Sequence, residues 1–312
     1  MPTPPAARDQ LLANGGLAVM VLLGGGFFPV LERTLETWDS LSATAARQTI
    51  GGIALCLVLA ARERHLRWLS GVAWPRLLWL SLVGMGFGSV LVSWAVAYSD
   101  GVSAAIVSAA NPILAALIAR LLYRHQLTRA MAIGTVLAVA GGLVAIVGDG
   151  RSIGEIRGGE ILMLGAGALW TWYSIAAQRL LAGQSQLAIT ALTTLPSGLA
   201  LTALSVILGA SGVMQVRVDF SPPTLLLLLY AGLLMIGVAN LLWHFGVSRV
   251  GVAVATMYTN LMPVAAVLVT LWLGTPPTGA QLVGGGVILA GVLYSQLAAR
   301  APAPAARQVA AP

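Results

Sequence analysis

Apolar stretches of membrane-spanning length, separated by short polar connections, run through almost the whole sequence. Of the 312 residues, 58% are hydrophobic and 9% are charged, whereas a soluble globular domain carries about a quarter charged residues. The hydrocarbon core of a bilayer is about 30 Å thick, and a helix of about 20 residues crosses it. The sequence therefore predicts an all-α membrane protein in which nearly every element spans the bilayer.

Ten stretches meet this length criterion, so the chain is predicted to have ten transmembrane helices. They are residues 11–31, 41–61, 77–98, 102–123, 128–148, 159–181, 187–210, 224–247, 251–273 and 278–298. Several connections have only three to five residues, so successive helices are expected to be antiparallel neighbours. The remaining sequence is too short for a soluble domain.

The basic residues, all of them arginine, are distributed unevenly between the two sets of loops. Twelve arginines fall in the tails and the loops on their side, and four fall in the opposite loops together with most of the acidic residues. Cytoplasmic loops carry the excess of basic residues, so both termini are expected to be cytoplasmic in a cell inner membrane. The net charge of +7 is explained by this asymmetry, and a nucleic-acid-binding function is not expected.

The two halves of the sequence resemble each other. The segment 126–141 aligns with 276–291, and Trp94 aligns with Trp243. Because each half contains five spans, an odd number, the second half is expected to be inverted in the membrane relative to the first. The expected division is a first repeat at 1–148, a connecting loop at 149–158, a second repeat at 159–298 and a tail at 299–312.

A proline interrupts one span of each half, and polar residues precede each proline. Thr256, Thr259, Asn260 and Pro263 share one helical face of the span 251–273. The matching positions in the span 102–123 are Ser108, Asn111 and Pro112. Matched interrupted helices in an inverted repeat are typical of a transporter with its binding site near the membrane midplane.

The amides of Asn111 and Asn260 have two interpretations. An unpaired amide is costly in hydrocarbon, so each must bond either a neighbouring helix or a transported solute. Each asparagine lies within three residues of a proline that frees a backbone carbonyl, and this favours solute binding.

Arg47, in the second span, also has two interpretations. Its side chain could extend outward and pair with Glu36 or Asp39. Alternatively, its planar guanidinium could bind a substrate carboxylate with two hydrogen bonds, in an external vestibule.

Aromatic side chains complete the predicted site. Trp170 lies about halfway along its span, away from the headgroup regions where aromatic anchors are found. Trp94, Tyr98 and Trp243 lie near span ends and are either interface anchors or part of a vestibule or gate. The predicted substrate-binding residues are Ser108, Asn111, Trp170, Tyr173, Asn240, Tyr258, Thr259 and Asn260, with helix breaks at Pro112 and Pro263.

The residues of the spans argue against several other chemistries. Glu160, at the outer edge of its span, is the only acidic residue in the ten spans, and the three histidines are scattered. We therefore expect no catalytic group, metal site or cofactor, and no carboxylate-based proton coupling. The single cysteine, Cys56, excludes an internal disulfide. The many glycines indicate close helix packing rather than phosphate binding.

The segment Gly159–Tyr173 (GEILMLGAGALWTWY), the two proline-containing spans and Arg47 resemble the EamA-type proteins of the drug/metabolite transporter superfamily. The resemblance covers nearly the whole chain. It implies ten helices with both ends inside the cell, and alternating access in which helix hairpins move against a scaffold. It also implies the movement, commonly the export, of metabolites or amino acids, in some members aromatic amino acids.

Together these observations predict an integral-membrane transporter, not an enzyme, that exports or exchanges neutral or aromatic amino acids. Its partners would be a small-molecule substrate and the lipid bilayer, and we expect a monomer. Two alternatives stay open: a nucleobase, nucleoside or multidrug exporter of the same superfamily, and a membrane protein with a purely structural role.

Overall fold

The computed structural model describes residues 7–62, 72–99, 101–108, 129–147, 158–181, 183–250, 255, 258–259, 261–272, 274 and 277–300. These residues form helices joined by short turns, and no strand occurs among them. Five of the helical stretches are long and apolar enough to cross a membrane. The all-helical prediction is confirmed for this part of the chain.

The first half begins with two long helices, α1 (Ala7–Leu35) and α2 (Ser40–Arg62). The third span is continuous from Trp74 to Tyr98 and consists of α3 (Trp74–Trp79), the π-helical segment η2 (Leu80–Phe87) and α4 (Gly88–Tyr98). It is followed by α5 (Gly101–Ser108) and α7 (Arg129–Val147).

The second half repeats this order. It contains α8 (Gly159–Leu180), α9 (Gln186–Ala210), the continuous span α10 (Pro222–Leu229), η4 (Tyr230–Ala239) and α11 (Asn240–Val250), then α13 (Met262–Trp272) and α14 (Gly279–Arg300). Eight of the ten predicted spans correspond to these helices within a few residues. The spans predicted at 102–123 and 251–273 are described only in part, by α5 and α13.

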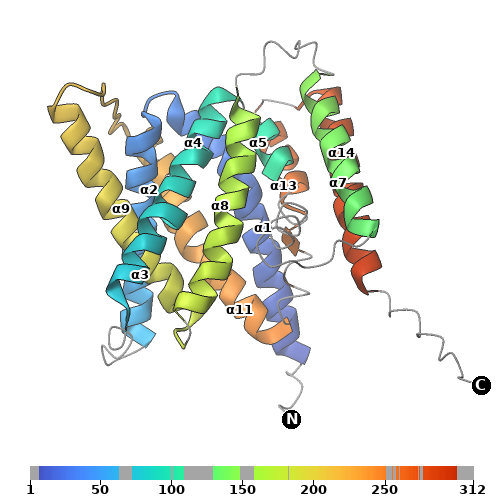
Figure 1. The fold of residues 1–312 in the computed structure, drawn as a ribbon, viewed down its shortest axis with the longest axis horizontal. Coiled ribbons are helices and arrows are strands. Elements are labelled where there is room, and N and C mark those ends of the chain that lie inside the picture. The colour runs from blue at the N-terminus through green and yellow to red at the C-terminus, as the bar shows by residue number, and fades with distance from the viewer. Residues whose placement is uncertain are drawn as a thin grey trace, which may run out of the picture.

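Corresponding helices of the two halves run in opposite directions (Figure 1). The start of α1 and the end of α14 lie at one end of the bundle, which we call the terminal end. The other end, where α1 stops and α8 begins, is called the distal end. The helix directions agree with the predicted inversion of the second half.

The two halves also pack reciprocally through α2 and α9. A Cβ atom on Gly52 of α2 would lie 2.6 Å from the Leu195 Cα of α9, and a Cβ atom on Gly198 of α9 would lie 2.5 Å from the Thr49 nitrogen of α2. Each helix therefore uses one glycine to let the partner backbone approach closely. The helices α7 and α14 form a second close pair at the side of the bundle (Figure 1).

The π-helical segments occupy matching places in the two halves. The segment η4 packs on α2, where a Cβ atom on Gly51 would lie 2.8 Å from the Gly232 carbonyl oxygen. The segment η2 packs on α9, where a Cβ atom on Gly86 would lie 3.2 Å from Ser197 Oγ. π-Helical turns are rare, widen the helix locally and often occur at functional sites. Their matched occurrence indicates a shared role in the two repeats.

At the distal end, the turn after α1 is joined to the connection between α9 and α10. Trp38 Nε1 donates a hydrogen bond to the Asp219 carbonyl (2.8 Å). The Asp39 backbone nitrogen donates to the Arg217 carbonyl (3.0 Å), and the Asp39 carboxylate accepts from the Arg217 backbone nitrogen (3.1 Å). These bonds connect residues about 180 positions apart, one from each repeat.

Candidate functional site

An apolar cluster lies in the distal part of the bundle. It consists of eight buried residues from α1, α4, α5, α8 and η4: Phe27, Leu31, Ala95, Val96, Ala104, Val107, Met163 and Ala231. We call this cluster the distal plug. Both repeats contribute residues to it.

Trp170 lies deeper than the distal plug, halfway along α8, and its exposure is unusual for its position. Its helical face also carries Met163, Ala166, Tyr173 and Ala177, which follow the spacing i−7, i−4, i+3 and i+7 and are each at most 5% exposed. Trp170 itself is 51% exposed. Trp170 is therefore accessible in the middle of a helical face whose other members are buried.

Tyr173, one turn further along α8, is held by hydrogen bonds. Its ring lies 5.4 Å from that of Trp170, and its hydroxyl shares a 2.7 Å hydrogen bond with Thr193 Oγ1 of α9. Ser81 of η2 donates to the Thr193 carbonyl (2.6 Å). Tyr173 is 5% exposed, so in this conformation it supports Trp170 and the junction with α9 rather than presenting its hydroxyl to a solute.

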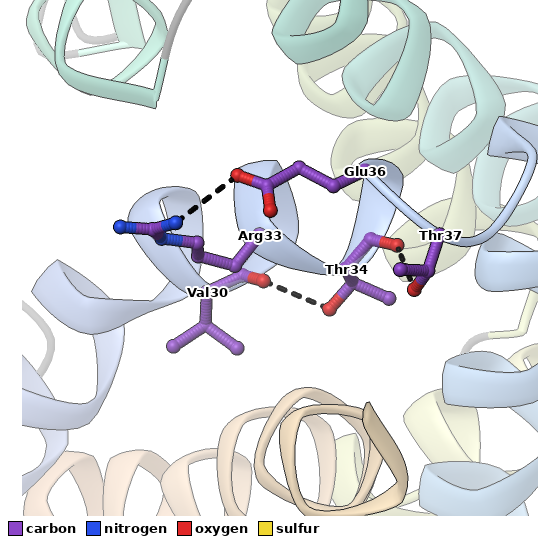
Figure 2. Close-up of polar contacts among 5 residues, drawn as sticks. All are labelled: Val30, Arg33, Thr34, Glu36 and Thr37. Carbon is purple, nitrogen blue, oxygen red and sulfur yellow. Dashed lines mark hydrogen bonds and ion pairs between the residues drawn. The ribbon is translucent and has the colours of Figure 1, made fainter. Parts of the chain in front are cut away.

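Arg47 does not extend outward, and the alternative in which it pairs with Glu36 or Asp39 is wrong. Glu36 pairs instead with Arg33, at 3.3 Å between Oε1 and Nη1 (Figure 2). The Asp39 carboxylate accepts hydrogen bonds from the backbone nitrogens of Ser42 and Arg217. Both carboxylates near the start of α2 therefore have partners other than Arg47.

The Arg47 side chain turns into the bundle, where it is 4% exposed. Its Nη2 donates to the Ser89 carbonyl (3.1 Å), and its guanidinium lies 5.1 Å from the centre of the Phe27 ring. In the described part of the chain, no carboxylate lies within ion-pair distance of it, and its Nε has no hydrogen-bond partner. Arg47 thus lies among buried side chains, and its role in a vestibule or gate stays a prediction.

Sequence reasoning missed Gln48, Thr194 and Ser197, which lie around the same part of the third span. Gln48 Nε2 donates to Ser89 Oγ, while Gln48 Oε1, Thr194 Oγ1 and Ser197 Oγ are buried without a hydrogen-bond partner. A signal was present, because Thr194 and Ser197 flank Pro196 inside α9. The spans at 102–123 and 251–273 show the same combination of a proline with polar neighbours.

Arg47 and Leu169, the residue before Trp170, contact adjacent residues of the third span. Arg47 bonds Ser89, while a Cβ atom on the adjacent Gly88 would lie 3.6 Å from the Leu169 side chain of α8, next to Trp170. At 1.5 Å per residue, Arg47 lies about 10 Å and Trp170 about 16 Å below the distal ends of their helices. These two depths differ by about one helical turn.

The other predicted residues are placed as follows. Asn240 is half-buried and donates from Nδ2 to the Ile236 carbonyl of its own span (2.7 Å), so its amide is used within the helix. Tyr258 and Trp243 pack against one apolar cluster with α1. Ser108 and Thr259 are half-buried.

Three predicted residues, Asn111, Pro112 and Asn260, lie outside the described residues. Pro263 lies in the first turn of α13, where proline is compatible with a helix, and its side chain is not among those described. The structure thus forms two groups of predicted aromatic residues, Trp170 with Tyr173 and Trp243 with Tyr258, and their roles in binding stay predictions.

Trp94 and Tyr98 line a separate apolar groove of about 670 Å³ between α4 and α9 near the distal end. Leu82, Phe87 and Leu204 also line it, and Asp39 and Arg217 lie at its polar end. Trp170 and Arg47 are not part of this lining. Among the described residues, no group of histidine, cysteine or acidic side chains could hold a metal ion.

Two helical repeats of opposite direction, joined by reciprocal glycine contacts and enclosing buried polar groups, define a multi-pass membrane protein built as an inverted repeat. The sequence profile of the EamA-like transporter family matches the chain twice, at residues 12–147 and 157–296. The protein therefore belongs to the EamA-like transporter family, as the resemblance in its sequence predicted.

A solved structure, described only as the crystal structure of a protein, has the same fold. Its TM-score is 0.65 at 19% sequence identity, and the alignment covers 96% of this chain and 100% of the other. At this identity the likeness concerns the fold alone. No curated protein matches the chain.

Proposed function

We propose that this transporter exports or exchanges neutral or aromatic amino acids by alternating access. The observation that carries the proposal is Trp170, which is 51% exposed in the middle of an otherwise buried face of α8. Open space against an indole ring at mid-depth suits the apolar side chain of a small solute. Family membership makes a small-molecule substrate the starting assumption.

Alternating access is supported by the arrangement of the distal plug and the π-helical segments. The plug joins helices of both repeats above Trp170, and η2 and η4 each pack against a helix of the opposite repeat. In the proposed cycle, the third and eighth spans shift at these segments and open the plug to the distal side. Closing the plug and opening the terminal side completes the transfer.

The proposed orientation follows from the arginine distribution, with both termini in the cytoplasm and the distal end outside the cell inner membrane. In a Cys56→Ser background, a single cysteine at Arg307 should be labelled by a membrane-impermeant maleimide only after the membrane is permeabilised. A cysteine at Asp149 should be labelled in intact cells. The reverse pattern would refute this orientation.

The substrate is tested by flux into proteoliposomes that contain the purified protein. A panel of labelled neutral amino acids would be compared with nucleosides and lipophilic cations. The variant Trp170→Ala would be compared with Trp272→Ala, a control at a residue of α13 that is 85% exposed. Saturable amino-acid flux that falls at least tenfold in Trp170→Ala, but not in the control, is the expected result. Saturable transport of nucleosides or cations alone would refute the amino-acid assignment, and unchanged flux in Trp170→Ala would refute the site.

A further inference from the structure

The guanidinium of Arg47 and the amide of Gln48 are adjacent in sequence, and both bond Ser89. Arg47 uses Nη2 for the Ser89 carbonyl, and Gln48 uses Nε2 for the Ser89 hydroxyl. Two fully buried hydrogen-bonding atoms of this pair have no partner: a donor, Arg47 Nε, and an acceptor, Gln48 Oε1. Both atoms are buried, so water does not satisfy them from an open surface.

A buried guanidinium without an acidic partner is energetically unfavourable. Removing a charge from water costs several kcal/mol, about as much as a well-placed counter-charge returns. The carboxylates nearest in sequence are bound elsewhere, Glu36 by Arg33 and Asp39 by backbone nitrogens. Within the described part of the chain, no ion pair supplies a counter-charge to Arg47, and a bound anionic group could supply it.

The pair of unused atoms matches one chemical class of ligand. An α-amino acid carries a carboxylate, which accepts hydrogen bonds, and an ammonium group, which donates them, on the same carbon atom. Arg47 Nε can donate to the first, and Gln48 Oε1 can accept from the second.

We infer that Arg47 and Gln48 form the polar end of the transport site, where Arg47 binds the α-carboxylate and Gln48 the α-ammonium group of the solute. This inference rests on the proposed amino-acid transport and adds the residues that recognise the zwitterion. Since both atoms are covered in the present conformation, the site opens when the third span shifts at η2. The π-helical segment ends at Phe87, two residues before Ser89.

The test measures competition against labelled phenylalanine flux in proteoliposomes with three unlabelled probes. The probes are phenylalanine, phenylalaninamide (which lacks the carboxylate) and 3-phenylpropanoate (which lacks the ammonium group). In Arg47→Met, the affinities for phenylalanine and 3-phenylpropanoate should fall about ten- to a hundredfold, which is the loss expected for hydrogen bonds to a charged group. The affinity for phenylalaninamide should be unchanged. In Gln48→Met, the affinities for phenylalanine and phenylalaninamide should fall, while the affinity for 3-phenylpropanoate should be unchanged.

Two further variants separate recognition from folding. Arg47→Lys keeps the buried charge but lacks the planar fork, so it should fold normally and still lose affinity for the two carboxylate probes. Arg33→Gln removes an exposed arginine from its ion pair with Glu36 and should leave all three affinities unchanged (Figure 2). Equal weakening of all three probes in folded Arg47→Lys would overturn the inference, because it would indicate a purely structural role.

The remaining outcomes also decide the question. Wild-type flux that disappears when chloride is replaced by gluconate would assign Arg47 to a chloride ion and overturn the carboxylate assignment. A wild-type protein that moves no amino acid would refute the proposed function and this inference together. Amino-acid flux with unchanged probe affinities in Arg47→Met and Gln48→Met would refute the inference alone.

Discussion

Two adjacent glycines of α7 offer a direct test of how closely the side pair of helices packs. A Cβ atom added at Gly141 would lie 2.6 Å from the Gly284 carbonyl oxygen and 2.9 Å from the Ile288 nitrogen of α14. A Cβ atom added at Gly142 would meet nothing within 4 Å. The variants Gly141→Ala and Gly142→Ala therefore differ in packing while sharing the same helix and the same chemical change.

The expected magnitudes follow from these distances. Ordinary contact begins at 3.4 Å, so Gly141→Ala forces α7 and α14 apart by up to 0.8 Å (3.4 minus 2.6) at this point. Overpacking of this kind costs about 1–3 kcal/mol. Replacing glycine by alanine inside a helix stabilises it by up to about 1 kcal/mol, and this gain applies to both variants. Gly141→Ala should thus be less stable than Gly142→Ala by about 1–3 kcal/mol.

The assay is thermal unfolding of both purified variants in the same detergent, together with amino-acid flux at a temperature where both are folded. Gly142→Ala should melt at or above the wild-type temperature, and Gly141→Ala below it. Flux should be unchanged in Gly142→Ala. Equal melting temperatures for the two variants would refute the close contact between α7 and α14 on which the reasoning depends.

Three further results are expected. Tyr173→Phe removes the 2.7 Å hydrogen bond to Thr193 and should lower the free energy of unfolding by about 1 kcal/mol; an unchanged melting temperature would contradict this bond. Trp38→Phe removes the 2.8 Å bond to the Asp219 carbonyl and should speed protease cleavage in the connection between α9 and α10, whereas unchanged cleavage would argue against the joined distal loops. Hydrogen bonds, first from the Ser221 hydroxyl and then from the Thr224 hydroxyl and the Ser221 backbone nitrogen, lower the pKa of Asp219 below its ordinary 3.8. The charged form of Asp219 is therefore favoured in the folded state. The wild-type protein should be more stable than Asp219→Asn above pH 3.8, and this difference should disappear as the pH falls through the lowered pKa. A pH-independent difference in melting temperature between the two proteins would refute this.

The helices were the most predictable part of the molecule because span length and apolar composition are properties of the sequence alone. The spans predicted at 41–61 and 187–210 correspond to α2 (Ser40–Arg62) and α9 (Gln186–Ala210). The π-helical segments could not be predicted in the same way. One extra residue per turn leaves the apolar composition unchanged, and the glycines in η2 and η4 resemble those of the regular helices.

The site was less predictable because its decisive contacts join residues far apart in sequence. Whether Arg47 turns outward depends on whether a nearby carboxylate is available as its partner. The Asp39 carboxylate instead accepts a hydrogen bond from the backbone nitrogen of Arg217, 178 positions away. The sequence predicts the position of Trp170 halfway along its helix. It does not predict the exposure of the side chain, because that depends on how the neighbouring helices pack. Gln48 was overlooked beside a charged neighbour, although an amide in an apolar span is itself a signal.

The joined distal loops restrict where the bundle can part. Trp38 and Asp39, at the tip of the α1–α2 hairpin, are fastened to the connection that follows α9, so the distal ends of α2 and α9 stay together. In the proposed transport cycle, a gap at that end would form on the opposite flank, between α5 and α8, whose residues Ala104 and Met163 meet in the distal plug. Release would then be one-sided: a solute at Trp170 would leave along α8, past the ends of α4 and α5, rather than between the two joined hairpins.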